Sequence, residues 1–418
     1  MDVTIVPGTL KGAVTPPPSK SQAHRLILAA ALSGGVSTLS NVDFSQDIEA
    51  TLGCMAALGA SIQRPEPGVV EIHGLGNSIV QAGPAPILDC GESGSTLRFL
   101  IPVALLVGGE AHFTGWGRLM ERPLTPYEDL FQEKGITWKR ENGVLSVDGG
   151  RGYDALALEP GEYVLPGNVS SQFFTGMLYA LPLLDGPSVL RSSTPLESRG
   201  YVDMTLDALR TFGVTAEETE PGVFAIPGNQ HYQPRNLAVE TDWSNAAFWY
   251  AANFLGAQVD IRNLNLDSVQ GDRQIGTLYW KLARPGDVDI DLSQCPDLAP
   301  PLAAMAAVRK GTTHFVNAGR LRMKESDRLE TIARTLNALG AKAQVGEDTL
   351  TLEGTDHLAG GTVDGCNDHR IAMMAAVAAI ACKQPVTVLG AECVKKSYPH
   401  FWWDYTALGG EVHGLVSG

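Results

Sequence analysis

Six segments of this chain are apolar around the whole helical circumference, and each begins with polar or charged residues. Bodies such as LILAAALS, FFTGMLYALPLL and IAMMAAVAAIA have no polar face, so we expect buried helices. Their polar starts are SKSQAHR from Ser19, ESGSTLR from Glu92, VSSQ from Val169, DWSNAA from Asp242, CPDLAP from Cys295 and CNDHR from Cys366. A fold that contains them must cover every one of these helices.

A second kind of helix alternates with the first and is amphipathic. In Asp327–Gly340 the apolar residues recur at the spacing of one helical face. The related segments are Asp47–Gly59, Pro126–Gly135, Tyr201–Gly213, Tyr398–Gly409 and a weaker copy, Ile275–Ala283, that lacks the final glycine. Glycine favours the left-handed conformation that ends a helix. Short β-like runs such as VLSVDG, LTLEG and VTVLG separate the helices.

The repeating unit therefore combines two helices with short strands, and it recurs six times at a period of roughly 70 residues. Two sets of three predict an α/β protein with two similar domains, residues 18–232 and residues 1–17 plus 233–418. The strand Val3–Val6 then belongs with the C-terminal half. We expect the crossings, Pro16–Pro18 and Gly228–Arg235, to form a paired hinge. Parallel buried helices would direct several N-termini, with their partial positive charge, at one surface.

The composition limits the possible partners. A formal net charge of −15 argues against nucleic acid as a general partner and requires any cations to be gathered in one place. The six cysteines form no CxxC pair and no zinc-type spacing, which is typical of a reduced cytoplasmic protein. The start, MDVTIVPG, does not resemble a signal peptide, and the longest apolar runs are shorter than a membrane span. We therefore expect a cytoplasmic protein with no membrane partner and no bound metal.

Residues near the helix starts suit a substrate that carries two phosphates, or a phosphate and carboxylates. The cations are Lys20, Arg25, Arg98, Arg122, Lys324, Arg328, Arg370 and Lys396. The uncharged donors are Ser21, the backbone at Gly94 and Ser95, Ser170, Ser171, Gln172 and Ser198, and the acids are Glu92, Asp297 and Glu325. Each motif taken alone also fits an ordinary helix cap, by Ser19 or Ser21, by Asp297 or by Asn367. A proton relay at His369 remains an open alternative. It is the combination that favours anion chemistry with one or two acids for proton transfer.

The motifs resemble those of 5-enolpyruvylshikimate-3-phosphate (EPSP) synthases, a family of the enolpyruvyl transferase superfamily. The resemblance covers nearly the whole chain. It is carried by PPSKSQAHR (17–25), LDCGESGSTLRF (88–99), MERPL (120–124), VSSQF (169–173), SRGYVDMTL (198–206), CPDLAP (295–300), RMKESDRL (322–329), CNDHRIAMMAA (366–376) and KKSYPHF (395–401). It implies an inverse α/β barrel fold of two domains, each with three βαβαββ-type units, and an active site in the interdomain cleft.

The resemblance also implies a reaction: transfer of the enolpyruvyl group of phosphoenolpyruvate to the 5-hydroxyl of shikimate 3-phosphate, in aromatic amino acid biosynthesis. It implies addition and elimination through a tetrahedral intermediate, without a cofactor. Because the predicted site residues are divided between the two domains, we expect a monomer that closes on its substrate. Shikimate 3-phosphate would be bound by Lys20, Ser21, Arg25, Ser170, Ser171, Gln172, Ser198, Asp297 and Lys324. Phosphoenolpyruvate would be bound by Lys20, Gly94, Arg122, Gln172, Arg328, Arg370 and Lys396. The catalytic residues would be Asp297 as base and Glu325 as acid, with Lys20 beside them.

Two positions depart from the family pattern. Glu92 stands where many members have Asn, and Arg320 stands where some members use Asn to bind the shikimate ligand. One alternative is the UDP-N-acetylglucosamine enolpyruvyl transferases. Those enzymes usually have a reactive Cys or an Asp on the loop before the arginine matched by Arg122, where this chain has Gly117. A second alternative, a non-catalytic anion-binding or RNA-processing protein on a related repeat fold, would require a basic track that a pI near 5.0 does not favour.

Overall fold

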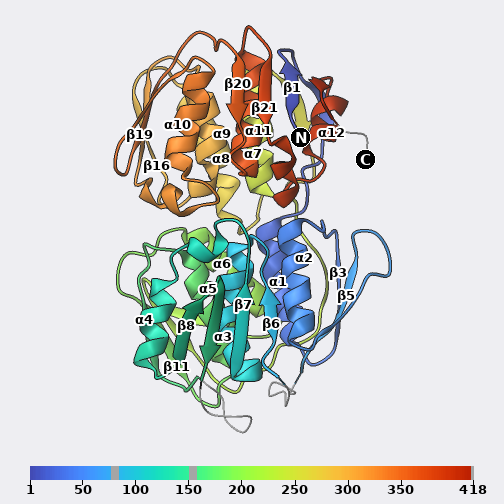
Figure 1. Ribbon diagram of the computed structural model, residues 1–418, viewed down its shortest axis with the longest axis vertical. Coiled ribbons are helices and arrows are strands. Elements are labelled where there is room, and N and C mark those ends of the chain that lie inside the picture. The colour runs from blue at the N-terminus through green and yellow to red at the C-terminus, as the bar shows by residue number, and fades with distance from the viewer. Residues whose placement is uncertain (77–83, 150–157, 416–418) are drawn as a thin grey trace. The chain divides into compact units, whose positions relative to one another are not determined.

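The computed structural model describes residues 1–76, 84–149 and 158–415, and the chain divides into two compact units (Figure 1). Unit 1 combines Met1–Pro17 with Thr241–Gly418, and unit 2 is Pro18–Glu240. Helices and short strands alternate through both units, as the sequence pattern predicts.

The described residues of unit 2 form three four-stranded sheets with one common pattern. In each sheet the first two strands pair in parallel, and the remaining pairs are antiparallel. In sheet order the strands are β14 (Asn236–Ala238), β3 (Val36–Ser40), β5 (Val70–His73) and β4 (Ser61–Gln63); β6 (Ile87–Asp89), β7 (Glu110–Thr114), β9 (Val144–Asp148) and β8 (Thr137–Glu141); and β10 (Glu162–Leu165), β11 (Ser188–Ser192), β13 (Val223–Ile226) and β12 (Glu217–Glu220). The shared pattern is the structural form of the sequence repeat.

Unit 1 has two sheets of the same pattern and one reduced sheet. The full sheets are β16 (Val288–Asp291), β17 (Thr312–Val316), β19 (Leu350–Glu353) and β18 (Lys342–Val345); and β20 (Gly361–Asp364), β21 (Val386–Leu389), β1 (Val3–Val6) and β22 (Glu411–His413). The reduced sheet is the parallel pair β15 (Gln258–Ile261) and β2 (Lys11–Val14). It belongs to the repeat with the weaker helix, Ile275–Ala283, which has no final glycine to turn the chain into further strands.

The first strand closes a sheet of unit 1, because β1 is antiparallel to both β21 and β22. Val3–Val6 thus pairs with strands of the C-terminal half of the chain. The other crossing lies later than the position predicted at 232–233, because β14 pairs with β3 and holds its residues in unit 2. Gly228–Arg235 also packs within unit 2, where the buried hydroxyl of Tyr232 donates to the carbonyl of Tyr179.

The chain passes between the units at Pro17–Pro18 and at Glu240–Thr241, and these two crossings lie side by side. The Ser19 N–H donates to the Glu240 carbonyl at 2.7 Å within unit 2. The Asp242 N–H donates to the Pro17 carbonyl at 2.9 Å within unit 1.

The predicted helices of both kinds are confirmed. The buried kind comprises α1 (Lys20–Leu32), α3 (Gly94–Gly108), α5 (Ser171–Ala180), α7 (Trp243–Phe254), α9 (Ala299–Ala306) and α11 (His369–Ala378). The amphipathic kind comprises α2 (Gln46–Ala57), α4 (Thr125–Glu133), α6 (Arg199–Thr211), α8 (Ile275–Ala283), α10 (Arg328–Ala338) and α12 (Phe401–Ala407). Every residue of α11 is buried, as its apolar circumference requires.

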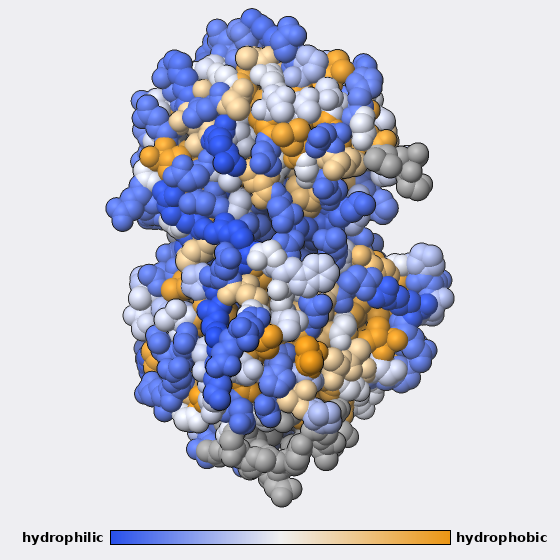
Figure 2. All heavy atoms as spheres, in the orientation of Figure 1, coloured by the Kyte–Doolittle hydropathy of each residue, from blue (hydrophilic) through white to orange (hydrophobic). Residues whose placement is uncertain are grey.

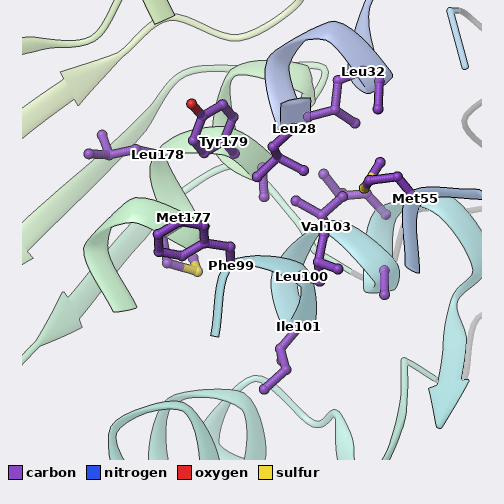
Figure 3. Close-up of a cluster of buried hydrophobic side chains, with 14 of the residues drawn as sticks. Leu28, Leu32, Met55, Phe99, Leu100, Ile101, Val103, Met177, Leu178 and Tyr179 are labelled. Atoms are coloured by element: carbon purple, nitrogen blue, oxygen red, sulfur yellow. The ribbon is translucent and has the colours of Figure 1, made fainter. Parts of the chain in front are cut away.

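The core of unit 2 is built where the buried helices meet. Figure 3 shows Leu28 from α1, Met55 from α2, Leu100 from α3 and Met177 from α5 turned toward one another. On the face drawn in Figure 2, hydrophobic residues are scattered among hydrophilic ones. No helix in the described parts of the chain is long and apolar enough to cross a membrane.

Candidate active site

The starts of the buried helices in unit 2 are capped by neutral serines. Ser19, not Ser21, caps α1, and its hydroxyl accepts the Gln22 N–H at 3.3 Å. Ser93 caps α3 and Ser170 caps α5 in the same manner. A serine cap satisfies one N–H of the first turn without adding negative charge. The partial positive charge of these helix starts is therefore not neutralised by their own caps.

Gln172 joins the starts of α3 and α5. Its side-chain oxygen accepts a hydrogen bond from Arg98 Nη1 at 2.7 Å, and its Nε2 donates to the Ser95 hydroxyl at 3.0 Å. These two bonds assign the orientation of the amide. Arg98 Nη2 also donates to the Pro123 carbonyl at 3.3 Å, which ties the segment around Arg122 to the same place.

Gly94 lies in close contact with two arginines, Arg98 and Arg122. A Cβ atom at residue 94 would lie 2.7 Å from Arg122 Nη1 and 3.2 Å from Arg98 Nη1. Glycine is therefore the residue that lets both guanidinium groups approach the first turn of α3. The Nε atom of Arg122 is buried without a hydrogen-bond partner among the described residues. A buried N–H donor without a partner is costly, so this arrangement suits an anionic ligand.

Lys20 and Arg25 are both engaged with protein groups. Lys20 Nζ lies 2.6 Å from Asp47 Oδ2 in an ion pair that is mostly shielded from solvent. Arg25 is 2% exposed and donates four hydrogen bonds, to Thr205 Oγ1, Thr175 Oγ1 and the carbonyls of Ser21 and Tyr201. Because a guanidinium has five N–H donors, the bonds within the described part of the chain leave one donor of Arg25 for a ligand.

Three further predicted residues of unit 2 lie at helix starts. Ser170 and Ser171 open α5, and Ser171 is buried. Ser198 precedes α6 with a left-handed φ of 53° and is also buried. Glu92, the departure from the family pattern, lies directly before the α3 cap, and its carboxylate lies against the backbone of Gly117.

In unit 1, Asp297 is the centre of the charged cluster. It lies in the 3-10 turn η4 (Pro296–Leu298) that leads into α9, so it does not cap that helix. Its Oδ1 lies 3.0 Å from Lys324 Nζ and 2.8 Å from Arg328 Nη1. Its backbone carbonyl accepts a hydrogen bond from Arg370 Nη1 at 3.3 Å. Four of the predicted residues, from three separate segments, therefore meet in one network.

Arg328 connects the two acids that the sequence singled out. Nη1 binds Asp297, and Nη2 lies 2.8 Å from Glu325 Oε2. Arg328 is 1% exposed, and burial opposes its charge; Asp368, Glu325 and Asp297 nevertheless hold the pKa of Arg328 above its ordinary value. Burial lowers the pKa of Lys324, and the charge of Arg328 adds to this effect against the opposing pull of Asp297. In this cluster each carboxylate is therefore paired with at least one cation, and Arg328 at its centre is buried.

The sequence analysis missed Asp368, which organises this cluster. It caps α11 by accepting the Arg370 N–H at 3.0 Å, so the alternative of Asn367 as the cap is wrong. Asp368 Oδ2 accepts from Arg328 Nε at 2.9 Å and from the Ser326 hydroxyl at 2.9 Å. The fully buried carboxylate therefore holds the Arg328 guanidinium and caps the helix that begins at Arg370.

Asn367 instead binds Lys396 through its backbone. It has a left-handed φ of 51°, and its carbonyl accepts a hydrogen bond from Lys396 Nζ at 2.7 Å. This bond brings Lys396 to the start of α11, the helix that carries Arg370. His369 is buried next to Asp368, with 4.0 Å between its Nδ1 and Asp368 Oδ1.

Comparison with known proteins places these clusters in context. The family model described as EPSP synthase (3-phosphoshikimate 1-carboxyvinyltransferase) matches residues 6–404. The chain belongs to the EPSP synthase family. A 3-phosphoshikimate 1-carboxyvinyltransferase of Clostridium kluyveri is 45% identical over 98% of both chains, and one of Clostridium acetobutylicum is 44% identical over 98% of both.

Solved structures agree with the family assignment. An EPSP synthase from Acinetobacter baumannii superposes with a TM-score of 0.80 at 26% identity, covering 99% of this chain and 100% of that one. The enolpyruvyl transferase NikO from Streptomyces tendae has a TM-score of 0.77 at 18% identity, which is a likeness of fold alone. The resemblance read from the sequence is confirmed, and so is the predicted fold class, the two-domain inverse α/β fold of EPSP synthases.

Proposed function

We propose that this chain transfers the enolpyruvyl group of phosphoenolpyruvate to the 5-hydroxyl of shikimate 3-phosphate and releases phosphate. The observation that supports the proposal is the family match over nearly the whole chain. Two clusters of polar residues, one in each unit, agree with it. Unit 2 presents cations and hydroxyl donors at helix starts that are capped by neutral serines. Unit 1 presents carboxylates held by buried cations.

The unit 2 cluster suits the binding of substrate anions. Phosphoenolpyruvate has a phosphate and a carboxylate, and arginine recognises both groups through paired N–H donors. Arg122, with its buried Nε, and the first turn of α3 at Gly94 are the groups we assign to that ligand. Ser170, Ser171, Gln172 and Ser198, with Lys20 and Ser21, supply the hydrogen bonds that a phosphorylated polyol requires.

The unit 1 cluster suits proton transfer. We assign Asp297 as the base that takes the 5-hydroxyl proton while the hydroxyl oxygen attacks C2 of phosphoenolpyruvate. Glu325 then gives a proton to C3 to form a methyl group in the tetrahedral intermediate. In the elimination step Glu325 takes a proton back from C3, the C2–C3 double bond forms, and the C2–O bond to phosphate breaks. Lys324, Arg328, Arg370 and Lys396 stabilise the negative charge that develops on the departing phosphate.

Asp297→Asn tests the assignment of the base. We expect kcat to fall by roughly 10²–10⁴, the usual effect of losing a general base, while both substrates still bind. The assay is phosphate release from phosphoenolpyruvate with and without shikimate 3-phosphate. Asp291→Asn is a matched control, because Asp291 is an exposed carboxylate at the end of β16, shortly before Asp297 in the chain. Near-normal turnover of Asp297→Asn would remove Asp297 from the mechanism.

The proposal includes closure of the two units on the substrate, since neither unit alone contains both clusters. The adjacent crossings at Pro17–Pro18 and Glu240–Thr241 would act as the hinge. Solution X-ray scattering should show a smaller radius of gyration when shikimate 3-phosphate saturates the protein; an unchanged radius would contradict closure. A cytoplasmic location and a monomeric state complete the proposal, and the first is supported by six cysteines that form no disulfide.

A further inference from the structure

A buried histidine that the assigned site does not use lies on α1, one helical turn after Lys20. His24 is 1% exposed, and its Nδ1 lies 2.7 Å from the hydroxyl oxygen of Thr51 on α2. Its Nε2 has no hydrogen-bond partner among the residues that the structure describes. Burial lowers the pKa of His24 well below its ordinary value of 6.5, and the charges of Lys20 and Arg25 add to this effect. The ring is therefore neutral and has a single N–H.

Three hydroxyl groups continue from His24 to the start of α3, and we call them the hydroxyl line. Thr51 Oγ1 lies 2.7 Å from Thr96 Oγ1, and Thr96 Oγ1 donates to the Ser93 hydroxyl oxygen at 2.7 Å. All three residues are buried. Ser93 is the cap of α3 and directly precedes Gly94. Hydrogen bonds between side chains thus connect α1, α2 and α3 inside unit 2.

The direction of these bonds follows from the single O–H that each hydroxyl group can donate. Thr96 uses its hydrogen for Ser93, since its other acceptor, the Asp47 carbonyl, is 3.5 Å away. Thr96 Oγ1 therefore accepts from Thr51, for which the same carbonyl, at 3.3 Å, is also the more distant acceptor. With its hydrogen used, Thr51 must accept a hydrogen bond from His24. The proton of the ring is therefore on Nδ1.

We propose that His24, as its Nδ1–H tautomer, is a positioning residue for phosphoenolpyruvate binding, and that it acts on the start of α3 through the hydroxyl line. The inference rests on the proposed function, in which Lys20 on α1 and Gly94 on α3 bind the same ligand. Two groups on different helices recognise one anion only if their separation is fixed. His24 contacts neither substrate in this assignment, so it is not a catalytic residue.

α2 sets this separation, because it packs against both α1 and α3. Two contacts hold it to α1, one helical turn apart: the ion pair of Lys20 with Asp47 at 2.6 Å, and the bond between His24 and Thr51. The bond between Thr51 and Thr96 holds it to α3. Without the Thr51 hydroxyl, the N–H of His24 would lose its acceptor in a buried place, and α3 would lose its link to α1.

The experiment compares Thr51→Val with Thr51→Ser in the full-length protein, by phosphate release from phosphoenolpyruvate in the presence of shikimate 3-phosphate. Valine resembles threonine in shape but has no hydroxyl, whereas serine keeps it. Thr51→Val should raise KM for phosphoenolpyruvate by on the order of tenfold, the effect of about one lost hydrogen bond. KM for shikimate 3-phosphate should change much less, because Gly94 is not assigned to that ligand. Thr51→Ser should restore the KM of the wild type.

Thr313→Val is the matched control. Thr313 is also fully buried, and its hydroxyl accepts a hydrogen bond from Arg309 Nη1 at 3.2 Å in unit 1. The control therefore loses a buried hydroxyl of the same kind away from the assigned residues, and KM for phosphoenolpyruvate should stay unchanged.

A spectroscopic measurement tests the tautomer in the wild type. With ¹⁵N-labelled histidine, NMR at neutral pH should show Nδ1 of His24 protonated and Nε2 without a proton. The signal is assigned by its absence from His24→Asn, in which the asparagine NH₂ group replaces the lost donor. A proton on Nε2 would reverse the hydroxyl line and overturn the inference.

The outcomes separate the inference from the proposed function. A wild type that releases no phosphate contradicts the proposed function and the inference that rests on it. With an active wild type, an unchanged KM for phosphoenolpyruvate in Thr51→Val overturns the role of His24 alone. An equal rise of KM for both substrates also overturns it, because Thr51 would then support unit 2 as a whole. If Thr51→Val does not fold, the tautomer of His24 in the wild type decides.

Discussion

The strongest structural prediction concerns Asp368, the buried carboxylate that holds Arg328. Asp368 accepts hydrogen bonds from Arg328 Nε and Nη2, from the Ser326 hydroxyl and from the Arg370 N–H. In Asp368→Asn one oxygen becomes an NH₂ group, so a donor faces the donors of Arg328 and Ser326. Removing one partner of a buried ion pair costs about 3–5 kcal/mol, because the other charge stays buried. Asp297 and Glu325 still face Arg328, so we expect a loss near 3 kcal/mol in the free energy of unfolding of unit 1.

Tryptophan fluorescence during urea denaturation is the appropriate assay. Five of the seven tryptophans lie in unit 1, so the signal reports mainly on the unit that contains Asp368. The matched control is Asp327→Asn, the same substitution at the cap of α10. Asp327 pairs with Arg322 at 2.9 Å, but both side chains are 32% exposed. An exposed pair contributes about 0–1 kcal/mol, and asparagine is an equally good cap.

The activity of Asp368→Asn should change with its stability. Arg328 loses the carboxylate that holds its guanidinium, while asparagine can still cap α11 at Arg370, so KM for phosphoenolpyruvate should rise through Arg328. If Asp368→Asn were no less stable than Asp327→Asn, the carboxylate would not hold Arg328 as described. If stability fell and KM stayed constant, Asp368 would support the fold without aligning Arg328.

Three further predictions concern the other cluster and the pH response. Arg122→Ala should weaken phosphoenolpyruvate binding by about 1.5–3 kcal/mol, the range for hydrogen bonds to a charged group, and shikimate 3-phosphate much less; an equal loss for both ligands by calorimetry would contradict this. Gly94→Ala should raise KM for phosphoenolpyruvate, because its Cβ would displace the Arg122 guanidinium; an unchanged KM would mean that Arg122 moves aside at no cost. Burial raises the pKa of Asp272, in the 3-10 turn η3 (Gly271–Gln274), from 3.8 to about 6. The protonated carboxyl group therefore contributes stability that is complete below pH 3.8 and is lost as the pH rises to about 6. The free energy of unfolding of Asp272→Asn, measured relative to that of the wild type, should therefore increase by up to roughly 3 kcal/mol between pH 4 and pH 7. A difference between the two proteins that does not change with pH would contradict the raised pKa.

The helices could be predicted because their signals are local. Ile275–Ala283 has the predicted bounds, and Asp47–Gly59 differs from α2 only at its ends. An apolar circumference or an apolar face, with a polar start and a glycine end, needs no knowledge of distant residues. The crossing at Glu240–Thr241 could not be found in this way. It depends on β14, a strand of three residues whose partner β3 is far away in the sequence.

The same limit applies to the candidate site. Lys324, Glu325, Arg328 and Arg370 were identifiable because each lies at a recognisable helix start. The buried aspartates that contact other elements could not be identified in this way. In the sequence, Asp47, Asp272 and Asp368 resemble ordinary residues of a helix start or turn, and their partners lie on other elements. The sequence could not identify Asp368 as the cap of α11, because the preceding Asn367 has an equally good capping side chain. Only the fold reveals that Asn367 has a left-handed backbone and that Asp368 accepts the N–H bond.

The capping residues explain how a chain of net charge −15 can serve anionic substrates. In unit 2 the buried helices start at Ser19, Ser93 and Ser170, so the helix starts keep their positive character. In unit 1 the caps of α7 and α11 are Asp242 and Asp368, and Asp297 lies in the turn before α9. Carboxylates at these positions offset the partial positive charge of the helix starts, and the cations Arg370 and Lys396 lie at the start of α11. The same repeat thus has serine caps in unit 2 and aspartates at the corresponding helix starts of unit 1, which agrees with the proposed division between anion binding and proton transfer.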